Sequence, residues 1–349
     1  MADPRPQGSP DARESPIRLL LHPQPLARAR RVDPVAHSGR GVVAPGSVLV
    51  SDVDVSICIA TYRRRFGLAR LLDSVSRLKV PEGVRVEVIV VDNDPASNPA
   101  DVPGPDAASP FPLRWLREPR RNISYARNLA VANARGEWIA FTDDDEVLDE
   151  RWLAAYWKRA AEGECDGYFG PVLTQIETWC TPWLDASFFA HARFASGTRI
   201  TQLGAHTGNA FVRRALLRDA RFDPAFGRSG GEDTALFRAL VARGARFAWC
   251  DEAVVHEYVT ASRHRPGWLA QRAFRSGCTH ARVERGLGRV PSRAAAASRA
   301  AAAAGVLLVA ALALLPAGRA CSLRTLRRAL SQAGQCWGHL GGSYEEYAD

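Results

Sequence analysis

Residues 138–146 read WIAFTDDDE. The apolar start of this stretch predicts a buried strand over residues 138–141, and four carboxylates follow where the strand ends. Three consecutive aspartates repel one another, so a fold tolerates them best where a cation neutralises them. Hard divalent ions such as Mg²⁺ or Mn²⁺ bind carboxylate oxygens and leave positions open for substrate phosphates. The stretch therefore predicts a metal site at residues 143–145; the alternative is a solvated acidic turn with a helix-capping aspartate.

Strands and helices alternate on the N-terminal side of this stretch. Between the apolar strands lie a helix over residues 66–78 and a second helix that Ser124 caps and Gly136 ends. The apolar runs predict strands over residues 55–61, 84–91 and 113–116. This alternation predicts an α/β fold with a mostly parallel sheet whose faces are covered by helices.

A second polar cluster ends the strand over residues 84–91, where residues 90–95 read VVDNDP. Ligands of open α/β sheets bind beyond the carboxyl ends of the strands. Asp92 and Asp94 can accept hydrogen bonds from a nucleotide base or ribose there, or form an Asx turn before Pro95. Arg127, in the first turn of the helix capped by Ser124, suits an anionic phosphate, although most helix arginines are simply solvated.

Several other classes of protein are excluded. The turn after the first strand reads ATYRRR (residues 60–65), so a Gly-x-Gly-x-x-Gly dinucleotide site is not supported, and no P-loop occurs. With 46% apolar, 24% charged and 8% aromatic residues, the chain is neither disordered throughout nor collagen-like. Seven scattered cysteines without a Cys-x-x-Cys pair indicate a reduced, cytosolic compartment.

The second half of the chain adds three candidate residues. Glu232 and Asp233 follow two glycines at the start of a helix that runs to Val241, where they either cap the helix or supply a general base. His256, next to Glu257 at a strand end, is either a further metal ligand or an ordinary structural histidine. Strands are predicted over residues 168–173, 246–249 and 254–257.

Five ordered motifs between residues 53 and 277 resemble those of family 2 glycosyltransferases. They are IATYR (59–63), VVDND (90–94), YARN (125–128), FTDDDE (141–146) and GGED (230–233). Within the family, four stretches are similar to those of bacterial succinoglycan-type glucosyltransferases. They are DNDP (92–95), NISYARN (122–128), FGPV (169–172) and GGEDT (230–234). The Gln-x-x-Arg-Trp signature of processive synthases is absent, and residues 268–272 (WLAQR) hold similar residues in another order. A single-transfer enzyme is therefore favoured.

The resemblance implies a GT-A fold and transfer of a sugar, with inversion, from a nucleoside-diphosphate sugar such as a UDP-hexose to a saccharide acceptor. That acceptor is expected to be lipid-linked, in extracellular or surface polysaccharide synthesis. The resemblance also implies Mg²⁺ or Mn²⁺ as cofactor, with Asp143 and Asp145 as ligands; His256 is a further candidate ligand from its place at a strand end. Asp233 is implied as the catalytic base, with Glu232 beside it. The residues implied to hold the nucleotide-sugar are Thr61, Arg63, Asp92, Asp94, Arg127, Asp143 and Asp144.

Two alternatives come from other classes. Residues 88–94 and 139–144 also resemble the strand-and-aspartate motifs of haloacid-dehalogenase-type phosphatases. Those enzymes usually need a lysine between the motifs, but none lies between Asp92 and Asp143, and Ala96 stands where Thr or Val is expected. A non-catalytic membrane scaffold is the third hypothesis, and it leaves the acidic strand ends unexplained.

The charge distribution separates the ends of the chain from its centre. Residues 260–349 hold 13 of the 46 basic and 4 of the 37 acidic residues, around an uncharged, alanine-rich stretch at 300–317. This pattern indicates a membrane surface and not nucleic acid, with a helix that spans the membrane, lies on it, or packs in the protein interior. The expected location is the cytoplasmic face of the bacterial inner membrane, with the chain either peripheral or spanning once, or otherwise the cytoplasm. The predicted parts are a disordered Pro/Arg-rich tail (1–50), a GT-A domain (51–290) and a helical membrane-associated region (291–349).

Overall fold

A computed structural model describes residues 53–97, 110–176, 188–201, 204–316 and 318–344. All of them lie within residues 50–349, which form one compact unit. The predicted disordered tail, residues 1–50, lies outside the described residues.

The main sheet has eight strands in the order β3-β2-β1-β4-β9-β6-β10-β8. Strands β3, β2, β1 and β4 are mutually parallel, whereas β9 runs antiparallel to both of its neighbours, β4 and β6. β10 is parallel to β6, and β8 is antiparallel to β10. The bounds are β1 Val55–Thr61, β2 Val86–Asp92, β3 Leu113–Arg117, β4 Trp138–Asp143, β6 Gly167–Phe169, β8 Arg199–Ile200, β9 Asn209–Arg213 and β10 Phe247–Trp249.

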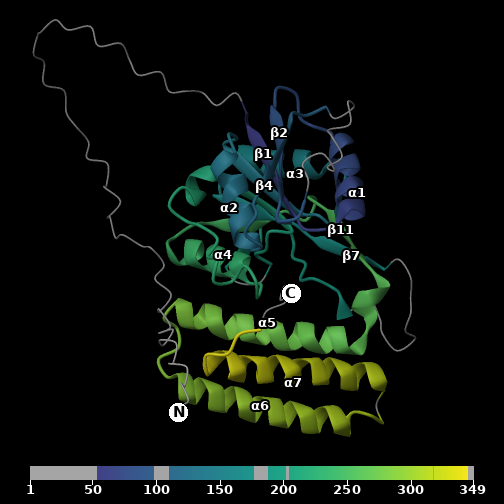
Figure 1. Cartoon of the computed structure of the whole chain (residues 1–349), viewed down its shortest axis with the longest axis vertical. Coiled ribbons are helices and arrows are strands. Elements are labelled where there is room, and N and C mark those ends of the chain that lie inside the picture. Colours follow the sequence, from purple (N-terminus) through teal and green to yellow (C-terminus); the bar gives the residue numbers. More distant parts are fainter. Residues whose placement is uncertain (1–52, 98–109, 177–187, 202–203, 317, 345–349) are drawn as a thin grey trace, which may run out of the picture. The chain divides into compact units, whose positions relative to one another are not determined.

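Helices cover both faces of this sheet (Figure 1). Side chains alternate along β1, so that Ile57 and Ile59 pack with α1 and α3 on one face, while Cys58 packs with α2 and α4 on the other. The helices are α1 Arg65–Ser76, α2 Ile123–Asn133, α3 Trp152–Ala161 and α4 Glu232–Ala242, with short 3₁₀ turns η3 Arg214–Leu217 and η4 Ala261–His264. The predicted α/β architecture is thus confirmed.

The register of the parallel strands brings the polar residues at their carboxyl ends to one edge. Thr61 pairs with Asp92, and Ala60 pairs with both Val91 and Asp143. The residues after β1, β2 and β4 therefore share the end of the sheet at which ligands of open α/β folds bind.

Two local predictions are corrected. The strand expected over residues 168–173 is two strands: β6 ends at Phe169, and β7 (Val172–Ile176) joins β5 (Glu146–Leu148) and β11 (Val255–Val259) in a second sheet. The break lies at Gly170, where a Cβ would stand 2.3 Å from the carbonyl oxygen of Ala253, and at Pro171, which has no N–H to donate.

The second correction concerns the start of α2. Its cap is Asn122, whose side chain accepts a hydrogen bond from the Ser124 backbone N–H at 3.0 Å. The Ser124 hydroxyl instead donates to the carbonyl oxygen of Asp223 at 2.9 Å. Serine and asparagine are almost equally good caps, so the choice depended on this tertiary contact.

Three long helices form a separate layer, α5 (Pro266–Gly286), α7 (Arg319–His339) and α6 (Arg293–Ala313), in that spatial order (Figure 1). α7 lies between the other two helices. Residue 290, the predicted domain boundary, lies between α5 and α6. We call these three helices the helical layer.

Two glycines allow α5 and α7 to approach closely. A Cβ on Gly334 would lie 1.9 Å from the carbonyl oxygen of Phe274, and one on Gly277 would lie 1.9 Å from that of Ser331. Such contacts are far inside van der Waals distance, so even alanine would push the helices apart.

We expect Gly334→Ala to lower the free energy of unfolding by about 1–3 kcal/mol, measured by urea denaturation. The matched control is Gly305→Ala in α6, where no heavy atom lies within 4 Å of the added Cβ. That variant should be stabilised by about 0.5–1 kcal/mol through helix propensity. Equal stability of the two variants would contradict the close approach of α5 and α7.

Candidate active site

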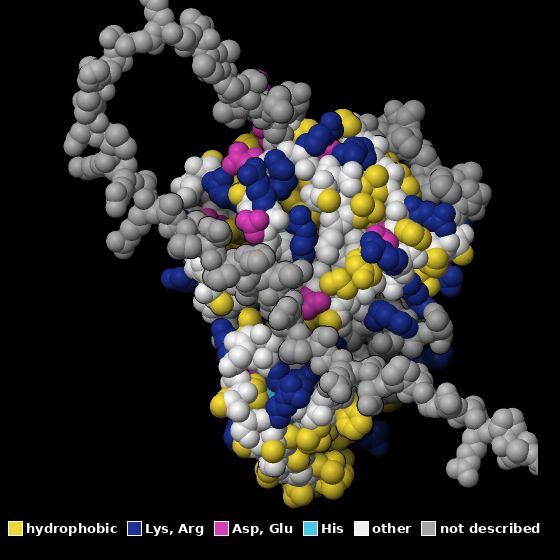
Figure 2. All heavy atoms as spheres, turned by 60° about the vertical axis from the view of Figure 1, so that its left-hand side comes forward, with side chains coloured by type: hydrophobic (Ala, Val, Ile, Leu, Met, Phe, Trp, Pro, Cys, Tyr) yellow, Lys and Arg dark blue, Asp and Glu magenta, His cyan; other side chains and the backbone are white. Residues whose placement is uncertain are grey.

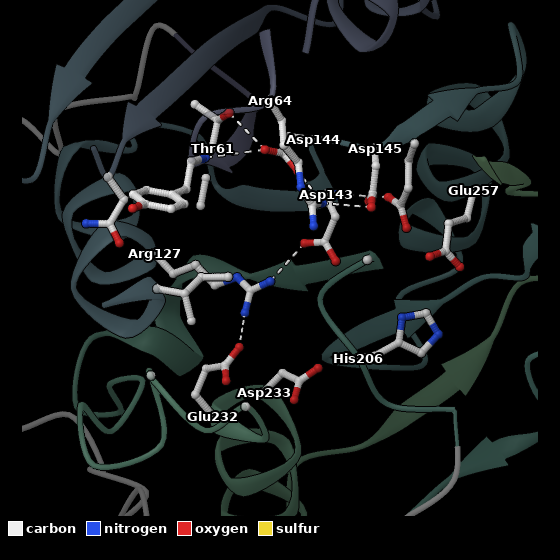
Figure 3. Close-up of a pocket in the computed structure, with 18 of the residues that line it drawn as sticks. Thr61, Arg64, Arg127, Asp143, Asp144, Asp145, His206, Glu232, Asp233 and Glu257 are labelled. Carbon is white, nitrogen blue, oxygen red and sulfur yellow. Dashed lines mark hydrogen bonds and ion pairs between the residues drawn. The ribbon is translucent and has the colours of Figure 1, made fainter. Parts of the chain in front are cut away.

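A cavity of about 440 Å³ opens at the carboxyl ends of β1 and β4. Its walls come from the ends of these strands, the starts of α2 and α4, and the segment from η4 into α5. Figure 3 shows the side chains at the strand ends and at the starts of α2 and α4. Seven residues that the sequence marked as functional line it: Thr61, Arg127, Asp143, Asp144, Asp145, Glu232 and Asp233.

Arginines neutralise the acidic turn after β4. Nη1 of Arg64 lies 2.9 Å from Asp144 Oδ1 and 2.7 Å from Asp145 Oδ2. Nη2 of Arg263 lies 2.8 Å from the same Asp145 oxygen. Neither arginine was singled out from the sequence, because their proximity to the turn depends on how η4 and the β1–α1 connection fold back.

Asp144 and Glu146 are the buried members of this turn. Thr61 Oγ1 donates to Asp144 Oδ2 at 2.8 Å, and Thr142 Oγ1 donates to Glu146 Oε2 at 2.7 Å. Burial, opposed by Arg64 and reinforced by Asp145, raises the pKa of Asp144 to about 6. Burial, together with the charge of Asp143, also raises the pKa of Glu146. Burial and the neighbouring carboxylates therefore both disfavour the charged forms of Asp144 and Glu146.

Arg127 connects this turn to the start of α4. Its Nη2 lies 2.8 Å from Asp143 Oδ1, and its Nη1 forms an ion pair with Glu232. Both Arg127 and Glu232 are buried. Burial, opposed by Arg127 and reinforced by Asp233, raises the pKa of Glu232 to about 7. Removal of Arg127 would leave Glu232 as a buried charge without its partner, which is costly.

Gly230 and Gly231 make the turn into α4 possible. Their φ angles are +77° and +93°, in the left-handed region that side chains disfavour. A Cβ on Gly231 would also lie 2.0 Å from Cγ2 of Thr279 on α5. This turn places both Glu232 and Asp233 on the cavity wall.

Two histidines line the cavity near Asp233 and Glu257. Burial and the neighbouring His191 lower the pKa of His206 to about 4, so its ring is neutral at pH 7. Nε2 of His191 lies 3.1 Å from Glu257 Oε2. Burial works against ionisation of Glu257, but the hydrogen bond to His191 and the charge of Arg263 outweigh it and lower the pKa of Glu257 to about 2.

The structure does not bring His256 to the acidic turn. Its Nδ1 lies 3.1 Å from Nε2 of Gln175, and it is not among the residues that line the cavity. Because side chains alternate along β11, the neighbouring Glu257 faces the cavity instead. The predicted grouping of His256 with Asp143 and Asp145 is therefore corrected.

Three residues predicted for the nucleotide-sugar also lie off the cavity wall. Arg63 Nε lies 2.8 Å from Asp94 Oδ2, and Asp92 Oδ1 accepts a hydrogen bond from the Asp94 backbone N–H at 2.9 Å. Asn93, between them in sequence, lines the cavity instead. The pair of Asp92 and Asp94 shapes this turn, as the Asx-turn alternative predicted.

Sequence reasoning missed several cavity residues. The sequence held one signal for two of them. Trp268 and Arg272 are four residues apart, so they share one face of a helix, but the WLAQR stretch that contains them was compared only with the residue order of the Gln-x-x-Arg-Trp signature. Tyr62, Asn93 and Glu146 stand within the quoted motifs but were given no role, and no local pattern marked the remaining residues. The missed residues are Tyr62, Arg64, Asn93, Arg121, Glu146, His191, His206, Glu257, Arg263, Trp268, Arg272 and Arg275.

Comparison with known proteins identifies the family. The model of glycosyl transferase family 2 matches residues 56–221. The succinoglycan biosynthesis protein ExoM of Rhizobium meliloti (strain 1021) is 37% identical over 234 residues, which are 66% of this chain and 74% of ExoM. The chain belongs to glycosyltransferase family 2. A second relative of this glycosyltransferase is ExoO of the same organism, 38% identical over 110 residues, or 31% of this chain and 30% of ExoO.

Solved structures of S. aureus TarS are also similar to this family 2 glycosyltransferase. TarS 1–349 gives a TM-score of 0.49 at 15% identity, covering 81% of this chain and 92% of that one. Its complex with UDP gives 0.46 at 14% identity, covering 84% and 93%. Family membership confirms the GT-A fold and the enzyme class expected from the sequence. It excludes the phosphatase and the non-catalytic scaffold as alternatives.

Proposed function

We propose that this glycosyltransferase is a metal-dependent, inverting hexosyltransferase. Its donor is a nucleoside-diphosphate sugar, a UDP-hexose, and its acceptor is a lipid-linked saccharide at the cytoplasmic face of a bacterial inner membrane. The observation that supports this proposal best is the placement of Asp143, Asp145 and Asp233 around one cavity (Figure 3). Two carboxylates there suit a metal-bound diphosphate, and the third suits a general base.

The carboxylates fit a metal that the substrate helps to bind. Within the described part of the chain, no three His, Cys, Asp or Glu side chains gather closely enough to hold an ion by themselves. Mg²⁺ commonly takes one or two carboxylates and completes its shell with water and substrate phosphates. Asp143 and Asp145 would hold Mg²⁺ or Mn²⁺ in this way, and the bound ion would neutralise the leaving diphosphate.

The arginines that contact the acidic turn would also interact with the diphosphate. Arg64 and Arg263 both bind Oδ2 of Asp145, so a metal ion at that oxygen would compete with them. Their positive charge would then face the diphosphate. Arg127, already within reach of Asp143, can stabilise the same negative charge.

Asp233 is the better candidate for the base, because Glu232 is held by Arg127 and is partly protonated near neutral pH. In the proposed step, an acceptor hydroxyl oxygen attacks the anomeric carbon while the bond from that carbon to the diphosphate oxygen breaks. The hydroxyl proton passes to Asp233. A single displacement of this kind inverts the anomeric configuration.

The nucleoside end of the donor belongs at the β1–α2 side of the cavity. Thr61, Tyr62, Asn93, Arg121 and Asn122 line it. The Arg121 guanidinium stacks over the Tyr62 ring at 4.9 Å, which provides a flat cationic surface beside an aromatic one. Arg63, Asp92 and Asp94 remain predicted nucleotide contacts next to this side.

Exposed apolar side chains on α6 support membrane attachment. Val306 and Val309 are 70% and 67% exposed, Leu308 and Leu312 are exposed beside them, and Leu315 is exposed just after the helix. Figure 2 shows hydrophobic side chains gathered at the end of the molecule that the helical layer forms. By length and composition α6 can cross a membrane, and arginines precede and follow it. An apolar surface of this kind, bordered by arginine, suits an anionic bilayer.

A donor screen tests the proposed activity. The full chain is incubated with UDP-, GDP- and TDP-hexoses, and release of the nucleoside diphosphate is measured with and without Mn²⁺. We expect release from a UDP-hexose that depends on the metal and increases when a lipid-linked saccharide extract is added. Equal release with and without metal would contradict the proposed mechanism.

The membrane proposal predicts that the full chain floats with vesicles containing phosphatidylglycerol. We expect the triple variant Val306→Ser, Val309→Ser, Leu312→Ser to stay mostly in the soluble fraction, because each side chain loses about 1–2 kcal/mol of apolar burial. Phe66→Ser is the matched control, since Phe66 is 95% exposed but lies on α1. If the triple variant floats as much as the control, α6 does not make the membrane contact.

A further inference from the structure

The side chain of Asp233, the proposed base, is held only by its own surroundings in sequence. Among the described residues, its Oδ1 accepts hydrogen bonds from the backbone N–H and the hydroxyl of Thr234, at 2.6 and 3.3 Å, and from no other group. The neighbouring Glu232, by contrast, is fixed by its buried ion pair with Arg127. The direction in which Asp233 points therefore depends on the backbone of the turn before α4.

Residues 222–231, which we call the base segment, lead into this turn, and α2 holds the start of the segment. Asn122 Nδ2 donates to the carbonyl oxygen of Pro224 at 2.9 Å. The backbone N–H of Phe222 donates to Asn128 Oδ1, also at 2.9 Å. These contacts fix the beginning of the base segment, but the end that enters α4 needs other partners.

α5 supplies those partners from the helical layer, in which it is the helix that lies beside α4 (Figure 1). Arg282 Nη1 donates to Ser229 Oγ at 2.5 Å, and its Nη2 donates to the carbonyl oxygen of Ala225 at 2.8 Å. The same guanidinium lies 4.6 Å from the centre of the Phe226 ring. A planar guanidinium holds several groups in one fixed geometry, so this single side chain ties three residues of the base segment to α5.

Thr279 holds the two glycines that end the base segment. It lies three residues before Arg282 on α5, so the two side chains share one face of the helix. Its Oγ1 donates to the carbonyl oxygen of Gly230 at 3.3 Å, and its Cγ2 occupies the space that a Cβ on Gly231 would need. Because glycine has the most backbone freedom of any residue, the turn depends on such contacts to keep one conformation.

We propose that Arg282 and Thr279 are positioning residues for the transfer reaction, which hold the base segment so that Asp233 points at the acceptor hydroxyl. This inference rests on the proposed function, which makes Asp233 the base. Neither residue is among those that line the cavity, so each acts through the turn and not on the substrates. A misplacement of about 1 Å at a reacting group can cost about 10²-fold in rate. The helix that joins the helical layer to the cavity thus also fixes the base.

The test compares kcat with donor affinity in the full chain, using the hexose donor that the screen identifies and the lipid-linked saccharide extract. Arg282→Met keeps the length of the side chain but removes its N–H donors. We expect kcat to fall about 10- to 100-fold, while UDP affinity with Mn²⁺ stays nearly constant because Glu232 keeps its partner. Arg282→Lys retains the charge and one donor group and should recover part of the loss.

Thr279→Val tests the same role with a smaller change and provides the answer if Arg282→Met does not fold. Valine has the shape of threonine, so only the hydrogen bond to Gly230 is lost. We expect kcat to fall about 2- to 10-fold at constant UDP affinity. Wild-type kcat in this variant and in Arg282→Met would overturn the inference, and so would a loss of UDP affinity as large as the loss of kcat.

A double variant shows whether Arg282 acts through Asp233. In a chain that already carries Asp233→Asn, the further change Arg282→Met should lower kcat very little, because a displaced base and a missing base affect the same step. If the two losses instead multiply, Arg282 acts elsewhere and the inference is overturned.

Arg243→Met is the matched control, because Arg243 is exposed at the end of α4 and does not line the cavity. It should leave kcat and UDP affinity unchanged. The same variants separate this inference from the proposed function. If Asp233→Asn keeps normal turnover, the assignment of the base fails and the inference fails with it. If Asp233→Asn loses turnover but the α5 variants do not, the base stands and only the positioning role of α5 is lost.

Discussion

Asp145→Asn is expected to abolish the effect of Mn²⁺ on UDP binding. In the wild type, calorimetry should show that Mn²⁺ raises UDP affinity by about 100-fold, because the ion joins the carboxylate to the diphosphate. In the variant this ratio should fall to about 1. Affinity without metal should be unchanged or higher, since Arg64 and Arg263 lose a carboxylate that now holds them.

The control for this variant is Asp73→Asn. Asp73 is an exposed residue of α1 that pairs with Arg77, so the substitution removes one carboxylate without changing the cavity. It should keep the full metal effect. If Mn²⁺ still raises UDP affinity by the same factor in Asp145→Asn, Asp143 and not Asp145 is the metal ligand.

Asp233→Asn is expected to lower kcat by about 10²-fold or more while the affinity for the donor stays nearly constant. The amide keeps the shape of the side chain but cannot take a proton from the acceptor hydroxyl. Single-turnover transfer from a UDP-hexose measures the rate, and calorimetry with UDP and Mn²⁺ measures donor affinity.

Glu232→Gln provides the comparison. Its main effect should be on the position of Arg127, because it weakens the buried ion pair between them, and so UDP affinity should fall along with kcat. If instead Asp233→Asn keeps near-normal turnover and Glu232→Gln loses it at constant UDP affinity, Glu232 is the base.

The sequence determined where the acidic groups lie on the sheet. Apolar runs that end in polar residues placed Thr61, Asp92 and Asp143 at strand ends, and parallel pairing then brings these ends to one edge. Gly230 and Gly231 marked the turn that places Asp233 in the cavity, since a φ above zero favours glycine. These predictions succeeded because the spacing of apolar residues and the backbone geometry of a turn are local properties of the chain.

Only the tertiary structure decided which charges neutralise that edge. Arg64 and Arg263 come from connections far from residues 143–145 in sequence, and no spacing rule relates them to the acidic turn. Glu257 faces the cavity and His256 does not, because neighbouring side chains on β11 point to opposite sides of the sheet. A shift of one residue in the register would reverse the two. The sequence by itself thus determined the fold class and the acidic edge of the sheet, through local backbone preferences. Long-range packing decided which groups pair with those acids, because a charge is neutralised by whatever the folded chain brings within a few ångströms.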